Sequence, residues 1–153
     1  MLTMKWFFGD KEPLTDAYSI RREVFIHEQN VPEEEDIDGT DHSCIHLVAY
    51  DNGIPVSTGR IMVTKEDFII GRVATLKNYR GRGIATSVMH ALINACAEMG
   101  SDRKILHAQL TALSFYTKLG FTAYGDVFLD AGIQHVAMEH FGAERKCSQP
   151  ISQ

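Results

Sequence analysis

Arg80-Gly81-Arg82-Gly83-Ile84-Ala85 is the segment from which the architecture of this chain can be inferred. It follows an apolar, strand-like run at residues 68–75 and leads into an amphipathic, helix-like run at residues 84–99. Glycines in such a turn let an anion come close to the backbone, and the positive end of the helix macrodipole attracts it further. The two arginines can offer forked donors to phosphate oxygens. The segment therefore predicts a loop that binds a pyrophosphate.

The loop alone has three other interpretations. A Walker A loop needs Gly-x-x-x-x-Gly-Lys-Ser/Thr, and that lysine–hydroxyl pair is missing here. A dinucleotide-binding fingerprint needs a third glycine, whereas Gly81 and Gly83 are followed by Thr86, and the strands before the loop look like hairpins. An ordinary basic turn before a helix stays open at this point.

Outward from the loop, hydrophobic periodicity predicts a strand, a helix, three strands, a helix, a strand, a short helix and two final strands. The expected strands span residues 6–8, 44–50, 56–63, 68–75, 104–109, 121–124 and 133–139, and the expected helices start at Pro13, Ile84 and Leu113. Asp51-Asn52-Gly53 is a strong hairpin signal. The order predicts a mixed α/β (α+β) fold in one domain at residues 1–142, with a polar tail at residues 143–153.

Composition narrows the class of protein. A chain of 153 residues with 44% hydrophobic content has enough material for one globular core. A formal net charge of -5 argues against a general nucleic-acid binder. The three cysteines have no CxxC or metal-ligand spacing, so we expect no metal site and a reducing compartment. No apolar run reaches membrane-spanning length, which leads us to expect a cytoplasmic protein without a membrane partner.

A second motif, Phe115-Tyr116-Thr117-Lys118-Leu119-Gly120-Phe121, lies downstream of the loop. The two motifs together resemble the GNAT superfamily, the acetyl-CoA-dependent N-acetyltransferases. The loop matches that family's Arg/Gln-x-x-Gly-x-Gly/Ala pattern, and the second motif is close to its common Phe-Tyr-x-Lys-Leu-Gly-Phe form. The resemblance extends over about residues 20–138. It implies a GNAT-like central twisted mixed sheet of about six to seven strands flanked by about four helices.

Shorter matches point to one branch of that superfamily. Arg22-Glu23-Val24-Phe25 with Glu28-Gln29, and Leu129-Asp130-Ala131-Gly132-Ile133 with His135, resemble the ElaA/YjcF-like branch. Because these segments flank the two motifs on both sides, the resemblance covers most of the chain.

The resemblance implies acetyl-CoA as the acyl-donor cosubstrate. The coenzyme A diphosphate would bind the backbone amides from Arg82 to Ala85, with Arg80 anchoring the same region. The pantetheine arm would pair with Val73 and Thr75, in a gap where this strand and the next one splay apart. Gln109 stands at the position of a common pantetheine-binding asparagine. The implied cofactor-binding residues are Val73, Thr75, Arg80, Gly81, Arg82, Gly83, Ile84, Ala85 and Gln109.

The implied chemistry is direct transfer of an acetyl group from the thioester to a primary amine. In the family, a tyrosine at the position of Tyr116 is the general acid that protonates the leaving thiolate. A phenol has a reference pKa near 10, so it carries its proton at neutral pH. The amide near Val73 would stabilise the developing oxyanion.

The general base has no such clear match. Ile69, Ile70 and Gly71 stand where some members place a carboxylate or histidine, and none of them can accept a proton. The remaining candidates are Glu28, His107, Asp130 and His135, and we rank His135 and Glu28 ahead of the others.

The acceptor is expected to be a small-molecule or peptide amine. Acceptor pockets in this fold use the segments matched by residues 21–39 and 126–135, which carry no substrate code. Two other functions stay open, a non-catalytic acyl-CoA-binding module and an acyl-homoserine-lactone-synthase-like acyltransferase. Exposed late strands leave a homodimer open as well.

Three further features invite a structural interpretation. Gly59 inside a strand is typical of a bulge or a close backbone approach, and we expect Arg60 to pair with a nearby carboxylate. Cys96 falls on the apolar face of its helix and is expected in the core. The acidic run Glu33-Glu34-Glu35-Asp36 is expected to be a solvated loop or frayed helix.

Overall fold

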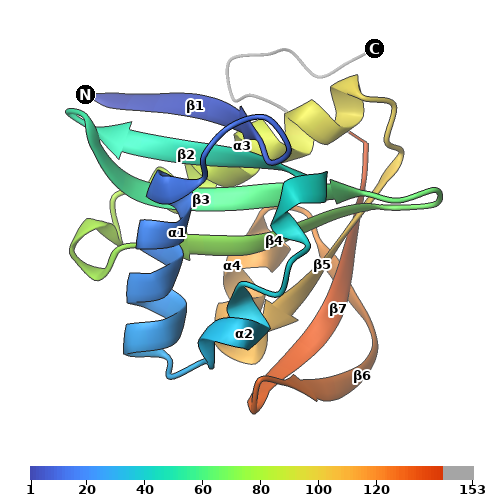
Figure 1. The fold of residues 1–153 in the computed structure, drawn as a ribbon. Coiled ribbons are helices and arrows are strands. Elements are labelled where there is room, and N and C mark those ends of the chain that lie inside the picture. The colour runs from blue at the N-terminus through green and yellow to red at the C-terminus, as the bar shows by residue number, and fades with distance from the viewer. Residues whose placement is uncertain (143–153) are drawn as a thin grey trace.

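Seven strands form one mixed sheet in the computed structural model of the chain, which describes residues 1–142 (Figure 1). The order of the strands across the sheet is β1-β2-β3-β4-β5-β7-β6. Only β4 and β5 pair in parallel; all other neighbours are antiparallel. The strands are β1 (Leu2–Phe8), β2 (Cys44–Asp51), β3 (Ile54–Val63), β4 (Phe68–Thr75), β5 (Arg103–Gln109), β6 (Thr122–Asp130) and β7 (Ile133–Phe141). The predicted fold class is therefore confirmed.

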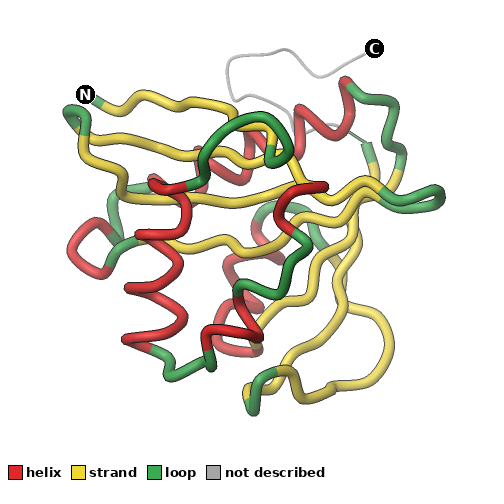
Figure 2. The backbone as a smooth tube through the Cα atoms, in the orientation of Figure 1, coloured by secondary structure: helices red, strands yellow, loops and turns green. Residues whose placement is uncertain are grey.

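The helices cover both faces of the sheet (Figure 2). They are α1 (Thr15–Arg21), its π-helical continuation η1 (Arg22–Glu28), α2 (Glu33–Asp36), α3 (Ile84–Glu98) and α4 (Leu113–Lys118). Short 3₁₀ turns lie at η2 (Asp41–Ser43), η3 (Lys77–Tyr79) and η4 (Leu110–Ala112). In Figure 1, α1 runs in front of β2 to β4 and α3 lies behind the same strands.

Strand alternation explains this two-sided packing. Successive side chains of a strand point to opposite faces of the sheet. Leu47 is fully buried in the cluster that includes Leu92 of α3, whereas its neighbour Val48 belongs to the cluster that includes Ile20 of α1. One strand therefore supplies core residues to both helices, which holds β2 to β4 rigidly between them.

Two glycine signals in the sequence have clear structural reasons. Asn52 and Gly53 form the β2–β3 turn at φ values of 49° and 84°, the positive-φ pair that a tight hairpin requires. Gly59 lies where the register of β3 shifts against β4, and a Cβ there would be 2.6 Å from Cδ1 of Leu92. The expected bulge and close approach at Gly59 are thus confirmed. Cys96 is fully buried, as expected.

The end of the sheet corrects one prediction. Residues 125–132, expected as a loop between the last two strands, belong mostly to β6, which continues to Asp130. A register shift between Tyr124 and Phe128 accommodates the extra residues, and a tight turn at Ala131 and Gly132 leads into β7. Because β6 is an edge strand with mostly exposed residues, it lacks the alternating pattern that predicts strands.

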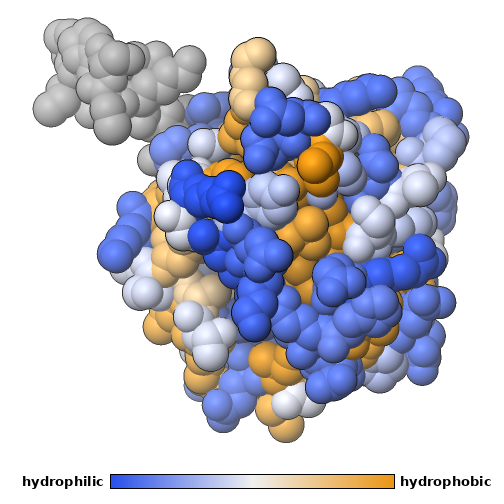
Figure 3. Space-filling model, turned by 90° about the vertical axis from the view of Figure 1, so that its left-hand side faces the viewer, coloured by the Kyte–Doolittle hydropathy of each residue, from blue (hydrophilic) through white to orange (hydrophobic). Residues whose placement is uncertain are grey.

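The surface fits the charged composition of the chain. Hydrophilic residues cover most of the face drawn in Figure 3, and hydrophobic side chains show between them in a central band. Within residues 1–142, no helix has the length and apolar character needed to cross a membrane. The polar tail expected at residues 143–153 lies outside the described residues.

Candidate active site

A cleft opens where β4 and β5 separate. The two strands pair only at Phe68 with Lys104 and at Ile69 with Ile105, so the rest of the β4 edge has no strand partner on that side. A cavity of about 390 Å³ lies there, lined by residues of η1, α2, β3, β4, β5, α4 and the β6–β7 hairpin. The expected splaying of these two strands is confirmed, and it leaves backbone donors and acceptors of β4 open to a ligand.

A bulge in β4 shapes the floor of this cleft. Gly71 pairs with Arg60 and Ala74 pairs with Thr58, which leaves Arg72 and Val73 together opposite Gly59. Arg72 has a φ of 51°, in the left-handed region that a side chain rarely adopts. Such a conformation costs about 1–3 kcal/mol and is concentrated at functional sites. The bulge re-aims the backbone at Val73, the amide predicted to face the thioester.

The glycine loop has the form that a pyrophosphate requires. Gly81 and Gly83 both have a φ of 78°, and a Cβ at either position would meet open space. Gly83 caps α3 with no side-chain hydrogen bond, so the first N–H groups of a 15-residue helix have no side-chain acceptor. Arg82 lies over the ring of Tyr79 at 4.9 Å. The residues present therefore fit an anion at this helix end.

Arg80 is tied to Glu28 across the cleft. Its Nη1 and Nη2 donate to the two carboxylate oxygens of Glu28 at 2.7 and 2.6 Å, and its Nε donates to the carbonyl of Thr75 at 2.9 Å. The hydrogen bonds from Arg80 lower the pKa of Glu28, and those to Glu28 raise the pKa of Arg80. Glu28 is not among the residues that line the cavity, although Arg80 and Thr75 are.

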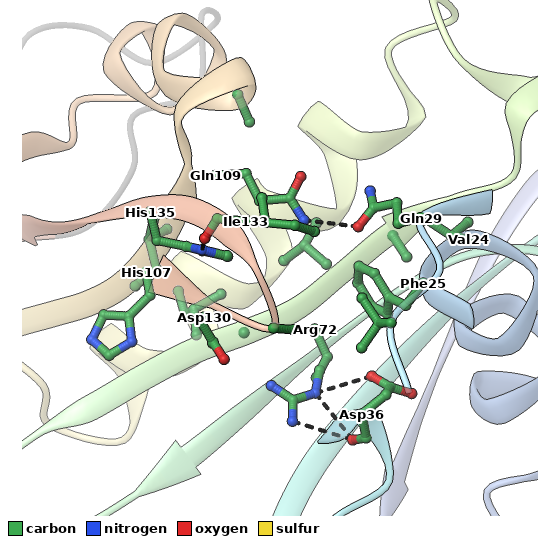
Figure 4. A pocket seen from close by; sticks show the side chains of 18 of the residues that line it. Val24, Phe25, Gln29, Asp36, Arg72, His107, Gln109, Asp130, Ile133 and His135 are labelled. Atoms are coloured by element: carbon green, nitrogen blue, oxygen red, sulfur yellow. Dashed lines mark hydrogen bonds and ion pairs between the residues drawn. The ribbon is translucent and has the colours of Figure 1, made fainter. Parts of the chain in front are cut away.

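A second link joins the same helix to β5. Nε2 of Gln109 donates to Oε1 of Gln29 at 2.9 Å, and both residues line the cavity (Figure 4). The sequence analysis names Gln29 only within the branch resemblance and does not predict this contact, because the two glutamines are 80 residues apart and no local pattern signals it. The end of η1 is therefore held to β5 by Gln29 and to the glycine loop by Glu28.

Tyr116 lines the cavity from α4, in an aromatic setting. Its ring makes edge contacts with Phe115 and Phe121, with ring centroids 5.0 and 6.1 Å away. Burial raises the pKa of Tyr116 to about 12. A phenol in this state keeps its proton at neutral pH, so Tyr116 can donate but not accept a proton there.

Among the candidate bases, His135 has the surroundings that best suit a proton acceptor. It is buried on β7, stacks on Phe128, and its Nδ1–H donates to the carbonyl of Ile133 at 2.7 Å. Because a carbonyl only accepts, Nε2 is left as the proton acceptor of the ring. In Figure 4 the His135 ring extends toward Ile133, and the His107 ring points to the opposite side. His107 is exposed but also lines the cavity, and its ring makes an edge contact with Phe128. Asp130 is exposed at the turn into β7 and also lines the cavity.

A buried charge network underlies the other end of the cavity. Arg21 donates to Asp36 and to both oxygens of Asp41, Arg60 donates to Asp41 at 2.7 Å, and Arg72 pairs with Asp36 at 3.1 Å. Burial alone would raise the pKa of Asp41, but the hydrogen bonds and charges of Arg21 and Arg60 hold it at about 2. The predicted pairing of Arg60 with a carboxylate is confirmed.

The same network corrects the interpretation of the acidic run. Residues 33–36 form the short helix α2 with Glu33, Glu34 and Glu35 exposed, as expected, whereas Asp36 at its end is only 2% exposed. The reason is the pair of arginines that meet it, Arg21 from α1 and Arg72 from β4, because a carboxylate can be buried when paired. No sequence pattern signals this contact between distant segments.

The comparison with protein families gives the class of the chain. A family model described as the acetyltransferase (GNAT) domain matches residues 11–140. The chain therefore belongs to the GNAT acetyltransferase family, and it is an acyltransferase.

Individual relatives place it more closely. It is 41% identical over 130 residues to the uncharacterised N-acetyltransferase YjcF of Bacillus subtilis (strain 168), covering 84% of this chain and 93% of YjcF. Escherichia coli ElaA has a TM-score of 0.83 at 27% identity, covering 90% of this chain and 99% of ElaA. An acyl-CoA N-acyltransferase from Pseudomonas aeruginosa has the same TM-score at 26% identity, covering 92% and 99%. Within the family, the chain is a member of the YjcF/ElaA branch.

Proposed function

We propose that the chain transfers an acetyl group from acetyl-CoA directly to a primary amine of a small molecule or peptide. The observation that carries this proposal is the cleft between β4 and β5, whose lining includes Arg80 next to the glycine loop, Tyr116 of α4 and His135 of β7. The Pseudomonas aeruginosa relative is itself described as an acyl-CoA N-acyltransferase. Donor binding and proton transfer would then take place in adjoining parts of one site.

The donor would be held mainly by backbone groups. The N–H groups from Arg82 to Ala85 would take the diphosphate, because they lie at the positive end of α3 and no side chain caps them. The free edge of β4 at Val73 and Thr75 would pair with the amide groups of the pantetheine arm, as a neighbouring strand would. Acetyl-CoA would supply the activated acyl group; the chain would bind and orient it.

Two side chains would move protons. Tyr116 would protonate the departing thiolate, since its raised pKa keeps the phenol protonated. His135 would accept the proton of the attacking amine at Nε2, directly or through water, because its Nδ1–H is held by the carbonyl of Ile133. Glu28 would be a positioning residue for Arg80 and not the base, because its carboxylate is bound by the Arg80 fork outside the cavity lining.

The test is amine-dependent release of the coenzyme A thiol, measured with acetyl-CoA and mixed primary amines. We expect release with the wild-type chain and a loss of about 100-fold or more in His135→Asn, with unchanged affinity for acetyl-CoA. His42→Asn is the control, because His42 is exposed and does not line the cavity, and it should keep most of the activity.

Three outcomes would contradict the proposal in different ways. Binding of acetyl-CoA without thiol release on a broad amine panel would indicate a non-catalytic binding module. Release of methylthioadenosine from S-adenosylmethionine would indicate a lactone-synthase-like reaction. Competition of ATP with coenzyme A would indicate a nucleotide site instead.

A further inference from the structure

Arg60 and Arg72 bring unused hydrogen-bond donors to the wall of the cavity. A guanidinium has five N–H donors on three nitrogens. Among the described residues, Arg72 uses Nε and Nη2, so its Nη1 makes no hydrogen bond. Arg60 uses only Nη1, which leaves its Nε and Nη2 without a partner in residues 1–142. Both side chains line the cavity.

The buried carboxylates nearby do not take these donors. Asp36 gives one oxygen to Arg21 and the other to Arg72. Asp41 gives Oδ1 to Arg21 and Arg60, and Oδ2 to Arg21. Each carboxylate oxygen already has an arginine partner, and the two residues that carry the remaining donors, Arg60 and Arg72, both line the cavity.

The charge balance of the buried groups points the same way. Three guanidinium groups, those of Arg21, Arg60 and Arg72, face two buried carboxylates. Burial lowers the pKa of Arg72, and the positive charge of Arg60 lowers it further. The nearest additional carboxylate is Asp38, 3.6 Å from Nη2 of Arg72, but it is 39% exposed and therefore screened by water. An anion in the cavity would complete the pairing of these arginines.

Backbone geometry fixes the direction of the Arg72 fork. The left-handed φ of Arg72 and its bonds to the carbonyls of Glu35 and Asp36 hold the guanidinium in one place. In Figure 4, Asp36 binds one edge of this group, and the opposite edge is turned away from Asp36. Arg72 immediately precedes Val73, so a ligand group bound here lies next to the site proposed for acyl transfer.

We propose that the acceptor amine carries a carboxylate, which binds to the free donors of Arg72 and Arg60 while the amine faces the acyl group. The inference rests on the proposed function. A carboxylate fits because its two oxygens match the planar donor fork of arginine. A neutral amine of the same size would leave these cavity-facing donors unpaired and would bind more weakly.

The experiment compares matched pairs of amines that differ only in their charge. The probes are β-alanine with β-alaninamide and 4-aminobutanoate with 4-aminobutanamide, measured by calorimetry on coenzyme A-saturated protein and by thiol release. O-phosphoethanolamine with ethanolamine tests the phosphate alternative. We expect at least one acid to bind about 10- to 100-fold more tightly than its amide, the range for a hydrogen-bonded charge.

Variants assign the preference to the named arginine. Arg72→Asn removes the guanidinium while asparagine tolerates the left-handed backbone, and it should reduce the acid preference to about twofold or less. Arg103→Gln is the control, because Arg103 pairs with Asp67 and Glu139 away from the cavity. Unchanged coenzyme A affinity and a cooperative unfolding transition show that Arg72→Asn is folded, even where the loss of its pairing with Asp36 lowers the unfolding midpoint.

The outcomes separate this inference from the proposed function. Thiol release with acids and amides at equal efficiency overturns the carboxylate site and leaves acetyl transfer intact. A preference for the phosphate over every acid, absence of binding by both members of all pairs, or an acid preference that survives in Arg72→Asn also overturns it. If coenzyme A itself fails to bind, the proposed function fails, and calorimetry of the acids and amides on the free protein still decides the inference.

Discussion

The cleft has two halves, and they differ in the chemical groups that form them. The proposed donor half, defined by the end of β4, the loop at residues 80–83, the start of α3 and α4, relies mainly on backbone groups and glycines of one continuous segment, to which α4 adds the side chain of Tyr116. The acceptor half, defined by η1, α2, Arg60, Arg72 and the β6–β7 hairpin, relies on charged side chains from distant segments. A backbone site recognises what the whole family shares, whereas a side-chain network can change with the substrate. The predictions below test this division, beginning with the largest expected effect.

Tyr116→Phe removes the proposed acid of the donor half without changing its shape. We expect kcat to fall by about 100-fold or more, because the thiolate would leave without a proton donor, while the affinity for acetyl-CoA stays unchanged. Tyr124→Phe on β6 is the matched control, since its ring contacts Arg103 and does not line the cavity. Thiol-release kinetics decide the matter: a Tyr116→Phe enzyme within twofold of wild type would remove Tyr116 from the chemistry.

Asp41→Asn breaks the charge network of the acceptor half. We expect a loss of about 3 kcal/mol in the free energy of unfolding at pH 7, because Arg21 and Arg60 lose their buried partner. The pKa of Asp41 is about 2 in the folded chain and ordinary in the unfolded one, so about 2 kcal/mol of this difference depends on pH. It is fully present above pH 4 and is lost as the pH falls through about 2.

Denaturant unfolding at several pH values between 7 and 2 measures this loss. Asp126→Asn is the control, because Asp126 is exposed on β6. A difference between wild type and Asp41→Asn that stays constant down to pH 2 would mean that the depressed pKa does not contribute to stability.

Gly83→Ala introduces a side chain at a left-handed position of the donor half. We expect the Kd for coenzyme A to rise about tenfold, because the loop would relax away from the geometry that presents its N–H groups. Gly53→Ala in the β2–β3 turn is closely matched, since its φ of 84° is similar to the 78° of Gly83 and neither Cβ meets an atom. It should cost a similar amount of stability and leave the Kd unchanged; equal effects on the Kd would refute a specific role for the loop.

Glu28→Gln tests the link between the two halves and should have the smallest effect. The Glu28–Arg80 pair is 36% and 40% exposed, so it contributes about 0–1 kcal/mol. We expect kcat to stay within about threefold of wild type, since in the proposed mechanism His135 and not Glu28 would accept the proton. A loss of 100-fold in kcat, seen in the same thiol-release assay, would return Glu28 to the role of base.

The sequence predicts the conformation of the proposed donor half because its determinants are local. The positive φ of Gly81 and Gly83, the start of α3 at Ile84 and the helix that carries Tyr116 each depend on a short segment, so a short motif can record them. The β4–β5 gap followed from the same resemblance. The acceptor half was harder, because the partners Gln29 and Gln109, or Asp36 and Arg72, meet only through the fold. The strand at residues 125–130 was missed for a related reason, since an exposed edge strand has no buried face to set an alternating pattern.

The π-helical turn η1 has a consequence for the coupling between donor binding and acceptor binding. Val24 and Phe25 of this turn line the cavity, while Glu28 and Gln29 at its end grip Arg80 and Gln109. Binding of a ligand in either half would therefore act on η1, because this turn contacts both halves. By thermodynamic reciprocity, any factor by which a bound donor strengthens acceptor binding is the factor by which the acceptor strengthens donor binding. Cooperativity between the binding of the two substrates would then depend on η1.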